Sequence, residues 1–552
     1  MIIWTSRTGP DDRFASNTRR VIFPKEPGIL NRSSQLHIET EIKFTLDADT
    51  VRKIPSSRLV RKNTQRKQRG SRYLSTYYDT RQHLLRKSGI ALRVRKVGDR
   101  IEQTIKIPIE GSVGMLNFEE WTVPLASDQP DLSRFDPAVI ARFNPKKRKI
   151  NLLPVFTTDI DRTVIELKYR GASIELALDQ GRIVGHGKSA RVADVRELEL
   201  ELLSGSPVDM LDFALALNED FEIHPEHRTK ARRGYALVRR SLRPRAVKAK
   251  HVLLDSRMSA GQAFQKIMAD ALQQLFQNER PTIEGIPEGI HQARVSIRRI
   301  RAALRAFKRV LPYDKRKAFN GEFRWFQHRL APARDWHVFY SETLPRIQDR
   351  KPNARVNLQR LKKLALTERR RATRDAAEVF KTRRYTRLLL QFQRWLLTLD
   401  PEKPPLDVPV TEFAIAVMKK SRRYLLTDTR PLSRMTEDEV HELRKRGKKA
   451  RYATEFFCDL WDQDEVKDSI KPMEELQDLL GEANDASVAR QLLAAVPLRA
   501  LYSSAFVLVQ RWSDEQSRRC IKSGQVIWRK IHKMSPFWLQ SDSSPPQGSG
   551  HC

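Results

Sequence analysis

Three charged side chains alternate with uncharged ones in the segment IETEIKF, residues 38–44. Successive side chains of an extended strand point to opposite faces, so Glu39, Glu41 and Lys43 would stand together on one face. Paired carboxylates bind hard divalent cations such as Mg²⁺ or Mn²⁺, which share their coordination with water and phosphate oxygens. The spacing predicts a metal–phosphate site if that face is enclosed, and a solvated surface if it is open.

Several further segments alternate in the same way, and the signs of their charges are segregated. Each segment alone is typical of an antiparallel sheet with one face in water. A closed barrel offers another arrangement, with the apolar faces outward beneath helices and a charged lumen. The acidic residues on the charged faces are Glu39, Glu41, Glu120, Glu197, Glu199 and Glu201. The basic ones are Lys43, Arg93, Arg95, Lys106 and Arg162.

A second charged pattern lies on predicted helices and occurs twice. The first stripe, at i, i+3, i+7 and i+10, consists of His291, Arg294, Arg298 and Arg301. The second begins 150 residues later (441 − 291 = 150) and consists of His441, Arg444, Lys448 and Arg451. One stripe alone is typical of a solvated helix face. Two such helices brought together would form a basic groove for phosphates, which Arg binds bidentately and Lys as a point charge.

The same offset relates residues 291–338 to residues 441–488 without a gap, which predicts a duplicated helical unit around a pseudo-twofold axis. The stripe positions are kept in both copies, whereas Arg305 and Lys308 correspond to Glu455 and Cys458. Asp335 and Asp485 also correspond, and fit either helix N-caps, partners of nearby arginines or a direct functional role.

The composition restricts the class of partner. The 103 Lys and Arg against 67 Asp and Glu leave a net charge of +36, which favours a polyanion: nucleic acid, a phosphate polymer or an anionic membrane surface. Nucleic acid is disfavoured because the basic helices lack interleaved aromatic residues. The most apolar run contains Pro497 and Arg499, so we expect no membrane span. The three scattered cysteines predict a reducing cytoplasm, without a disulfide framework or zinc site.

The hydrophobic rhythm divides the chain into two halves. Period-two patterns at residues 35–240 predict an antiparallel β tunnel or barrel with peripheral helices, an α+β domain. Period-3.6 patterns at residues 252–540 predict an all-α bundle that contains the duplication. Residues 1–34 are expected to be an irregular leader, residues 241–251 a linker, and residues 541–552 a disordered tail.

The charged strands resemble the CYTH family of triphosphate tunnel metalloenzymes. The resemblance rests on ETEIK, YYDT, ALRVR, TIK, TDIDR, ELELE and TKARRGY, in that order. It implies an eight-stranded tunnel and metal ligands Glu39, Glu41, Glu120, Glu199 and Glu201, with Mg²⁺ or Mn²⁺ as the metal. It implies phosphate binding by Lys43, Arg93, Arg95, Lys106, Arg162 and Lys230. The implied catalytic set is Glu39, Glu41, Lys43, Arg93, Arg95 and Lys106.

One segment departs from that family. LNFEEWTVPL has Asn117 or Phe118 where members often carry an arginine, and Thr122 where a second glutamate is common. This places one phosphate contact and one carboxylate in doubt. The Glu39/Glu41 strand and the Arg93/Arg95 pair are intact, which still favours an enzyme.

The helical half resembles the CHAD domain. The resemblance rests on HQARVSIRRIRAALRAF with LAPARDWHV, and on HELRKRGKKARYATEFF with LLGEANDASV. It implies binding of inorganic polyphosphate by the eight stripe residues. The family's Arg-Asp pair appears as Arg334-Asp335 in the first copy and as Asn484-Asp485 in the second.

Together the two halves resemble bacterial inorganic triphosphatases of CYTH-CHAD architecture. The resemblance implies hydrolysis of inorganic triphosphate to diphosphate and phosphate, with polyphosphate bound by the helical half. A non-catalytic polyphosphate-binding scaffold is one alternative. An adenylate cyclase or an organic triphosphatase of the same tunnel family is another.

Overall fold

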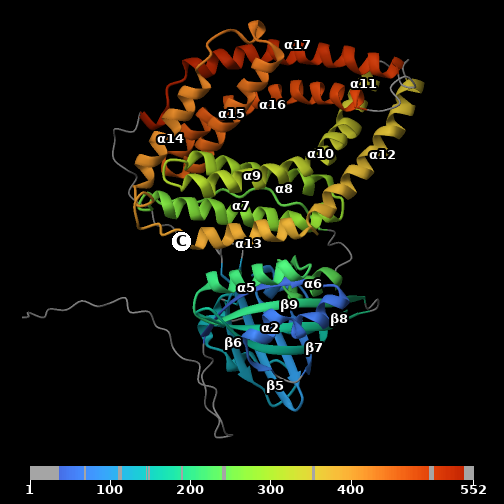
Figure 1. Cartoon of the computed structure of the whole chain (residues 1–552), viewed down its shortest axis with the longest axis vertical. Helices are drawn as coiled ribbons and strands as arrows, with labels where there is room; N and C mark the ends of the chain where they lie inside the picture. Colours follow the sequence, from blue (N-terminus) through green and yellow to red (C-terminus); the bar gives the residue numbers. More distant parts are fainter. Residues whose placement is uncertain are drawn as a thin grey trace, which may run out of the picture.

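The computed structural model describes residues 36–67, 70–109, 115–144, 146, 149–187, 191–238, 244–350, 355–495 and 503–539. The predicted leader at residues 1–34 and tail at residues 541–552 lie outside them. Strands fill the N-terminal half and helices the C-terminal half (Figure 1). Within the described residues, no helix combines the length and the apolar character needed to cross a membrane.

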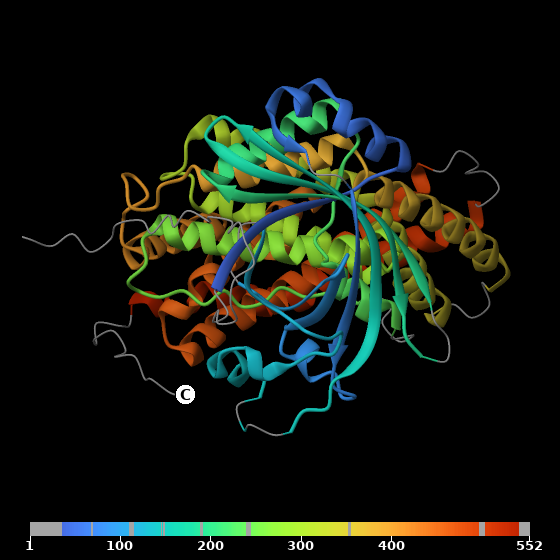
Figure 2. The same ribbon diagram turned by 90° about the horizontal axis from the view of Figure 1, so that it is seen from below.

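Eight strands close into an antiparallel barrel. Their order around the wall is β1-β6-β5-β4-β3-β7-β8-β9, and β9 pairs with β1 to complete the circle. Figure 2 views this curved wall from below. The eight strands are β1 (Leu36–Thr45), β3 (Ser71–Asp79), β4 (Ala91–Val97), β5 (Arg100–Pro108), β6 (Leu116–Pro124), β7 (Leu153–Tyr169), β8 (Ala172–Gly185) and β9 (Val192–Ser204). The short strands β2 (Thr64–Lys67) and β10 (His224–Pro225) pair with β7 and β1.

The outer face of the barrel carries the apolar half of each alternating pattern. Phe44, Leu178 and Leu200 are buried with residues of α1, α2 and α5 in one cluster, and Leu92 and Ile105 lie in a second cluster near α3 and α4. Burial of each large apolar side chain contributes about 1.5–3 kcal/mol. These helices are α1 (Ala48–Lys53), α2 (Arg58–Asn63), α3 (Leu84–Lys87), α4 (Pro137–Ala141) and α5 (Pro207–Asp220). Short 3₁₀ turns occupy Ile54–Ser56 and Leu132–Arg134.

One end of the lumen is covered by α6 (Lys230–Val238). Tyr235 packs edge-on against Phe156, which has the inward parity of β7, and donates a hydrogen bond of 2.8 Å to Asp79 Oδ2. Gly234 permits this approach, because a Cβ there would lie 2.2 Å from the Phe156 ring. The helix thereby brings Lys230, its first residue, to the lumen.

The C-terminal half is entirely helical in its described residues. Its helices are α7 (Ala260–Ile283), α8 (Pro287–Ala306), α9 (Tyr313–Arg329), α10 (Ala331–Val338), α11 (Leu344–Arg350), α12 (Arg355–Val379), α13 (Arg383–Leu397), α14 (Val410–Leu425), α15 (Glu437–Phe457), α16 (Gln463–Ala494) and α17 (Ser503–Lys533). A π-helical turn spans Phe339–Thr343, and 3₁₀ turns span Leu432–Arg434, Cys458–Leu460 and Phe537–Leu539.

The duplication extends beyond the charged stripes. The start of α14 follows that of α7 by 150 residues (410 − 260), and the same offset separates α8 from α15 (437 − 287) and α9 from α16 (463 − 313). Reciprocal hydrogen bonds join the copies: Ala260 N donates to Val408 O, and Val410 N to Met258 O. Reciprocity of this kind is the mark of a twofold relation. α16 is continuous where α9 ends and α10 begins, and only the first copy has a proline there, Pro332.

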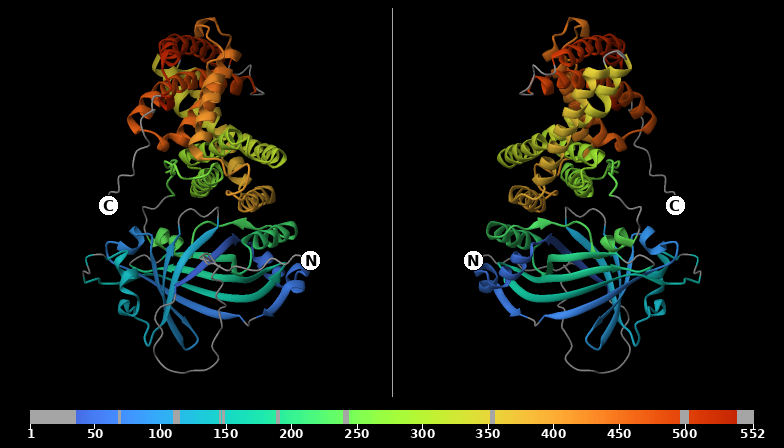
Figure 3. Two further views of the ribbon diagram at one scale, coloured as in Figure 1. Left: turned by 90° about the vertical axis from the view of Figure 1, so that its left-hand side faces the viewer. Right: turned by 90° about the vertical axis from the view of Figure 1, so that its right-hand side faces the viewer.

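The two halves meet through α13, which packs against α5 (Figures 1 and 3). Thr386 Oγ1 donates to Ile223 O at 2.8 Å, and Arg394 Nη2 donates to Asp212 Oδ2 at 3.1 Å. Leu390 of α13 is buried within the outer apolar cluster of the barrel. The interface therefore combines an apolar contact with directed polar bonds.

Candidate functional site

The strand registers place every predicted charge of the barrel on its inner side. Glu41 stands opposite Glu201 and Lys43 opposite Glu199 across the β1–β9 seam. The same parity holds around the wall for the predicted residues Glu39, Arg93, Arg95, Lys106, Glu120 and Arg162. Only 5% of the surface of Glu39 and 2% of that of Glu41 are exposed. The strand face that carries Glu39, Glu41 and Lys43 is therefore enclosed.

One part of the lumen holds carboxylates that are surrounded by cations. Asp179, Glu197 and Glu199 each offer an oxygen, and these oxygens lie within 4.8 Å of one another. Lys230 Nζ lies 2.6–2.9 Å from all three carboxylates, and Arg162 forms a bidentate bond to Asp179. Burial acts to raise the pKa of Asp179 and of Glu199, but the surrounding cations outweigh it and lower both pKa values.

A second part of the lumen has more carboxylates than cations. Burial raises the pKa of Glu39 to about 8; Lys106 opposes the rise, and Glu41 and Glu120 add to it. Burial also raises the pKa of Glu41 against the attraction of Lys43. Two strands further along the wall, burial and the neighbouring Glu201 raise the pKa of Glu175 to about 7. Lys106 and Lys43 thus relieve only part of the charge repulsion on this side.

This acidic side fits a divalent cation. Glu41 Oε1 is buried and accepts no hydrogen bond from the described residues, although Lys43 Nζ lies 3.0 Å away. Glu41, Glu201 and Glu175 stand side by side on β1, β9 and β8, where like charges repel one another. Hard oxygen donors of this kind suit Mg²⁺ or Mn²⁺. The paired trio around Asp179 fits a metal less well, because Lys230 and Arg162 already neutralise it.

A third part of the lumen has cations in excess. Burial lowers the pKa of Arg95 to about 10, and the positive charges of Arg93 and Arg162 act in the same direction. Arg95 Nε donates to Ser75 Oγ at 3.3 Å, and the nearest carboxylate, Glu102, is 3.9 Å from its Nη1. A buried guanidinium surrounded by like charges is suited to an incoming anion.

The departures near β6 are resolved by the register. Phe118, rather than Asn117, has the inward parity, since it stands opposite Glu39 on β1. Lys106 Nζ lies 5.6 Å from the Phe118 ring centroid, within cation–π range. Thr122 also faces inward and donates to Glu120 Oε1 at 3.1 Å. The ring of Phe118 and the hydroxyl of Thr122 thus face the lumen at the two positions where related sequences often carry an arginine and a glutamate.

The helical half contains a cavity of about 960 Å³ between its two copies. α8 packs against α15, and α10 against α16, so equivalent helices face each other there. Predicted residues that line the cavity are His291, Arg294, Arg298, Arg444, Lys448 and Arg451, with Asp335 and Asp485. Arg301 is not part of the lining but donates to Oε1 of Gln327, which is, at 2.7 Å, and His441 is exposed outside the lining. Both aspartates lie within helices and are not N-caps.

Cations crowd this cavity without enough counter-charge. Burial lowers the pKa of Lys448 to about 6, and the charges of Arg444 and Arg298 lower it further. Burial likewise lowers the pKa of His291 to about 4, helped by Arg334 and Arg298. An anion in the cavity would relieve this repulsion.

Two known protein families match this chain, one in the barrel half and one in the helical half. The CYTH domain family matches residues 37–235, and the CHAD domain family matches residues 266–494. The chain carries a CYTH domain followed by a CHAD domain.

Among individual proteins, the inorganic triphosphatase of Haemophilus influenzae is 30% identical over 165 residues, which is 30% of this chain. Those residues cover 45% of that protein, so the chain matches less than half of its length. The CHAD domain from Ricinus communis is 28% identical, covers 53% of this chain and 98% of its own, and has a TM-score of 0.47. PptA from Streptomyces chartreusis is 19% identical, covers 50% of this chain and 100% of its own, and has a TM-score of 0.35.

Sequence reasoning missed several charged residues of both domains. Glu175 and Asp179 belong to the segment SIELALDQG of the CYTH domain and have the same strand parity as the predicted charges. That parity was the signal that could have found them. Arg233 on α6 binds Glu197, and Arg346 on α11 reaches the CHAD cavity. Neither belongs to a repeated pattern, so only the fold brings them in.

The raised pKa of Glu39 predicts a pH-dependent stability. The folded protein retains a proton on Glu39 that the unfolded chain releases, so this group costs stability as the pH rises from about 4.5 to about 8. Without added metal, Glu39→Gln should raise the free energy of unfolding by at least about 1 kcal/mol at about pH 8.5. The gain should disappear towards about pH 5. Thermal unfolding across this pH range measures it.

Glu119→Gln is the matched control, because Glu119 lies on the same wall with outward parity and pairs with Arg142. Its effect should be small and should not change over this pH range. A Glu39→Gln effect that was equally independent of pH would contradict the assignment.

Proposed function

We propose that the CYTH domain hydrolyses a triphosphate with a divalent cation, and that the CHAD domain binds polyphosphate. The substrate we favour is inorganic triphosphate, cleaved to diphosphate and phosphate. The observation that carries the proposal is the lumen itself, where carboxylates in excess and cations in excess lie in separate parts of one enclosed space. The relative from Haemophilus influenzae, an inorganic triphosphatase, supports the same reaction.

Glu39, Glu41 and Glu201, with Glu175, are the residues we assign to Mg²⁺ or Mn²⁺. When bound, such a cation would neutralise charge on phosphate oxygens and lower the pKa of a water molecule. Glu120 and Glu199 belong to the ligand set that the sequence suggested. In the structure Glu120 lies 2.7 Å from Lys106, and Glu199 lies 2.6 Å from Lys230. Against the effect of burial, nearby cations lower the pKa of both, whereas the pKa of Glu39 stays raised although Lys106 binds it too. We therefore assign Glu120 and Glu199 to orienting the lysines.

Arg93, Arg95 and Lys106 are the residues we assign to the phosphate chain. Lys106 now binds the carboxylates of Glu39 and Glu120, and Lys43 lies 3.0 Å from Glu41. Entry of a cation with its triphosphate would exchange these partners: the carboxylates turn to the cation and the ammonium groups to phosphate oxygens. Phosphoryl transfer requires mainly such positioning and neutralisation of charge.

Neighbouring residues on opposite faces of β4 provide a sharp test of this assignment. Arg95→Ala removes an inward guanidinium, whereas Lys96→Ala removes an exposed ammonium one position later. Loss of one preorganised charge contact at the reacting group typically costs about 10²–10³ in kcat. Arg95→Ala should therefore lose about that factor in Mg²⁺-dependent release of phosphate from triphosphate, and Lys96→Ala should keep wild-type turnover. Glu41→Gln should lower this turnover by a similar factor.

Equal turnover in Arg95→Ala, Glu41→Gln and wild type would remove the catalytic proposal. It would leave the non-catalytic scaffold as the function of the chain.

The cavity of the CHAD domain supports the second half of the proposal. Its lining takes arginines and a lysine from equivalent positions of both copies, so positive charge surrounds the space from two sides. Burial lowers the pKa of Arg294 to about 10, and the charges of Asp335 and Asp485 oppose those of Arg298 and Arg334 without cancelling this effect. A flexible chain of phosphates satisfies many such cations at once, at an affinity that falls with added salt.

Charge reversal tests the cavity. Arg294→Glu with Arg444→Glu places two negative charges at equivalent positions of the lining, so polyphosphate retention should fall at least about 100-fold because several charge-assisted bonds are lost. Lys308→Glu with Lys445→Glu changes the net charge equally at exposed positions outside the lining and should retain binding. Fluorescence anisotropy with labelled polyphosphate measures both, and triphosphate turnover should stay unchanged. If both double variants lost binding equally, the net charge of the protein would account for the effect, and the assignment to the cavity would be wrong.

Lys448 predicts that polyphosphate binding depends on pH. Because its pKa is lowered to about 6, Lys448 is mostly neutral above pH 7, and a bound anion would raise the pKa and draw in a proton. Affinity should therefore fall by up to about tenfold per pH unit between about pH 6 and pH 8. Lys448→Arg keeps its charge and should flatten this dependence, whereas Lys448→Met should bind at pH 6 as weakly as wild type does at pH 8. His291, whose pKa is about 4, contributes little in that range. A slope unchanged in Lys448→Arg would exclude Lys448 as its source.

A further inference from the structure

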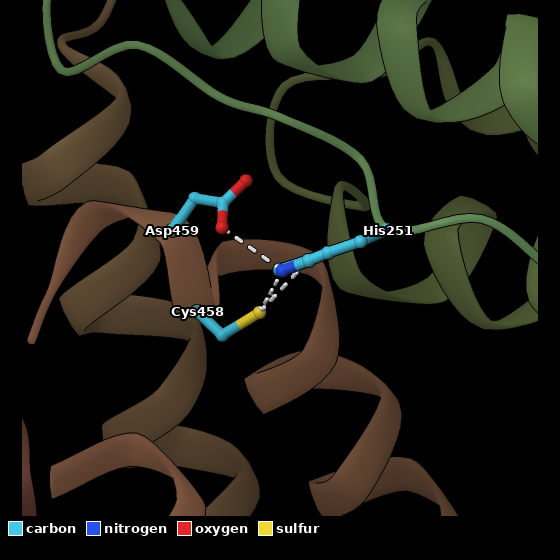
Figure 4. Close-up of side chains that lie close together, drawn as sticks. All are labelled: His251, Cys458 and Asp459. Atoms are coloured by element: carbon cyan, nitrogen blue, oxygen red, sulfur yellow. Dashed lines mark hydrogen bonds and ion pairs between the residues drawn. The ribbon is translucent and has the colours of Figure 1, made fainter. Parts of the chain in front are cut away.

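Three potential metal ligands meet where the chain enters the helical half. His251 reaches from the extended segment before α7 towards Cys458 and Asp459, which follow α15 (Figure 4). His251 Nε2 lies 2.9 Å from Asp459 Oδ1 and 3.2 Å from Cys458 Sγ. One ligand atom from each of the three residues lies within 4.8 Å of the others. The cysteine is buried, the aspartate is partly buried, and the imidazole is exposed.

Both partners of His251 lie nearest to Nε2, although Cys458 Sγ is also 4.0 Å from Nδ1. A ring nitrogen carries either one proton or one lone pair, so Nε2 has a single direction in which to serve two neighbours. A nucleophilic Cys-His-Asp triad would instead place the thiol and the carboxylate on different nitrogens. The donor atoms of Asp459 and Cys458 lie 2.9 and 3.2 Å from Nε2 and within 4.8 Å of each other, close to the spacing of roughly 3–4 Å that metal–ligand bonds of 2.0–2.3 Å produce. The geometry is that of a coordination site rather than a catalytic triad.

The surroundings orient the ligands. Leu254 N donates to Asp459 Oδ2 at 3.3 Å, and Gln463 Nε2 donates to Asp459 Oδ1 at 3.4 Å. Cys458 Sγ also lies 3.2 Å from Glu455 O. Hydrogen bonds to a ligating carboxylate are the usual second layer of a metal site, where they fix its position.

We propose that His251, Cys458 and Asp459 form a binding site for a borderline-soft divalent cation such as Zn²⁺. Sulfur, imidazole nitrogen and carboxylate oxygen are a donor set that Zn²⁺ accepts, whereas Mg²⁺ and Mn²⁺ favour oxygen donors like those of the tunnel. Binding would displace the thiol proton, since the thiolate is the ligand. The spacing of the cysteines gave no indication of this site, because it uses a single cysteine. The other ligands are a neighbouring aspartate and a histidine 207 residues earlier in the chain.

The site occurs in one copy of the duplication. The counterparts of Cys458 and Asp459 in the first copy are Lys308 and Arg309 (458 − 150 and 459 − 150), which cannot ligate a cation as ammonium and guanidinium groups. This is the place where the repeated stripe stops matching. The second copy has a thiol and a carboxylate where the first has two cations.

The fourth coordination position has a ready occupant. His251 and Cys458 line the same 960 Å³ cavity as Arg294, Arg444 and Lys448. Three protein ligands leave a tetrahedral ion with one open position, and this position would face the cavity. Resting on the proposed polyphosphate function, the inference extends to a phosphate oxygen as the fourth ligand. The cation would then add to the basic lining and fasten the segment around His251 to α15.

Cobalt(II) is the probe for the site, because Co²⁺ replaces Zn²⁺ and a thiolate ligand gives it a charge-transfer absorption that oxygen ligands do not. Titration of the metal-stripped full-length protein should produce this band with one equivalent of Co²⁺, and one equivalent of Zn²⁺ should abolish it. Cys458→Ser should eliminate the band, whereas Cys520→Ser, which changes the other described cysteine, should retain it.

His251→Gln is the second variant, because this exposed side chain can change without disturbing the core. It should weaken Zn²⁺ binding at least about tenfold, with thermal unfolding of the metal-free protein unchanged. A band that persists in Cys458→Ser, or the absence of a band in wild type, would overturn the site. Co²⁺ held in the tunnel cannot imitate the result, since its ligands there are oxygens.

Tripolyphosphate added to the Co²⁺-loaded protein tests the open position. It should shift the visible ligand-field bands of wild type, while Arg294→Glu with Arg444→Glu should keep the thiolate band and lose the shift. If the thiolate band forms but polyphosphate does not bind the protein at all, the proposed function fails and the metal site stands. If polyphosphate binds and the ligand-field bands do not move, the inference about the fourth ligand fails.

Discussion

The structure of the N-terminal half depends on one constraint: charges enclosed by a closed wall must be neutralised within it. A buried ion without a partner costs several kcal/mol, so carboxylates and cations have to be supplied to the lumen together. The β1–β9 seam brings Glu41 and Lys43 against Glu199 and Glu201, and α6 adds Lys230 from outside the sheet. Where neutralisation is incomplete, at Glu39 and at Arg95, the pKa values shift in opposite directions. The incomplete places are the ones suited to a metal and to an anion.

The CHAD domain leaves its charges incompletely neutralised in a different way. Its cavity collects cations from two equivalent helices and has fewer carboxylates than cations in its lining, so Lys448 and His291 lose proton affinity instead of gaining partners. Duplication doubles two of these contributions, because Arg294 and Arg298 of α8 have their counterparts Arg444 and Lys448 on α15 in the same lining. The stability lost through this repulsion is what a bound polyanion would return.

Much of this arrangement follows from the sequence, and the remainder follows from distant contacts. Strand parity grouped Glu39, Glu41 and Lys43 correctly, but the period alone does not distinguish the inside of a barrel from a solvated face. That choice is settled only when all eight registers close with the same parity inward.

Helical periodicity was similarly limited. It placed Arg301 and Arg294 on one stripe, yet the cavity spans less of α8 than the stripe does, and Arg301 packs against α9. His251 and Cys458 are 207 residues apart, and no local pattern links them.

Leu390 shows that the two domains share more than a linker. It belongs to α13 of the CHAD domain, and it is buried among Phe44, Leu200 and Phe213 on the outside of the tunnel. A chain ending after α6 would expose apolar surface on the outer side of β1, the strand that carries Glu39 and Glu41. The apolar packing of the tunnel wall therefore continues into the CHAD domain.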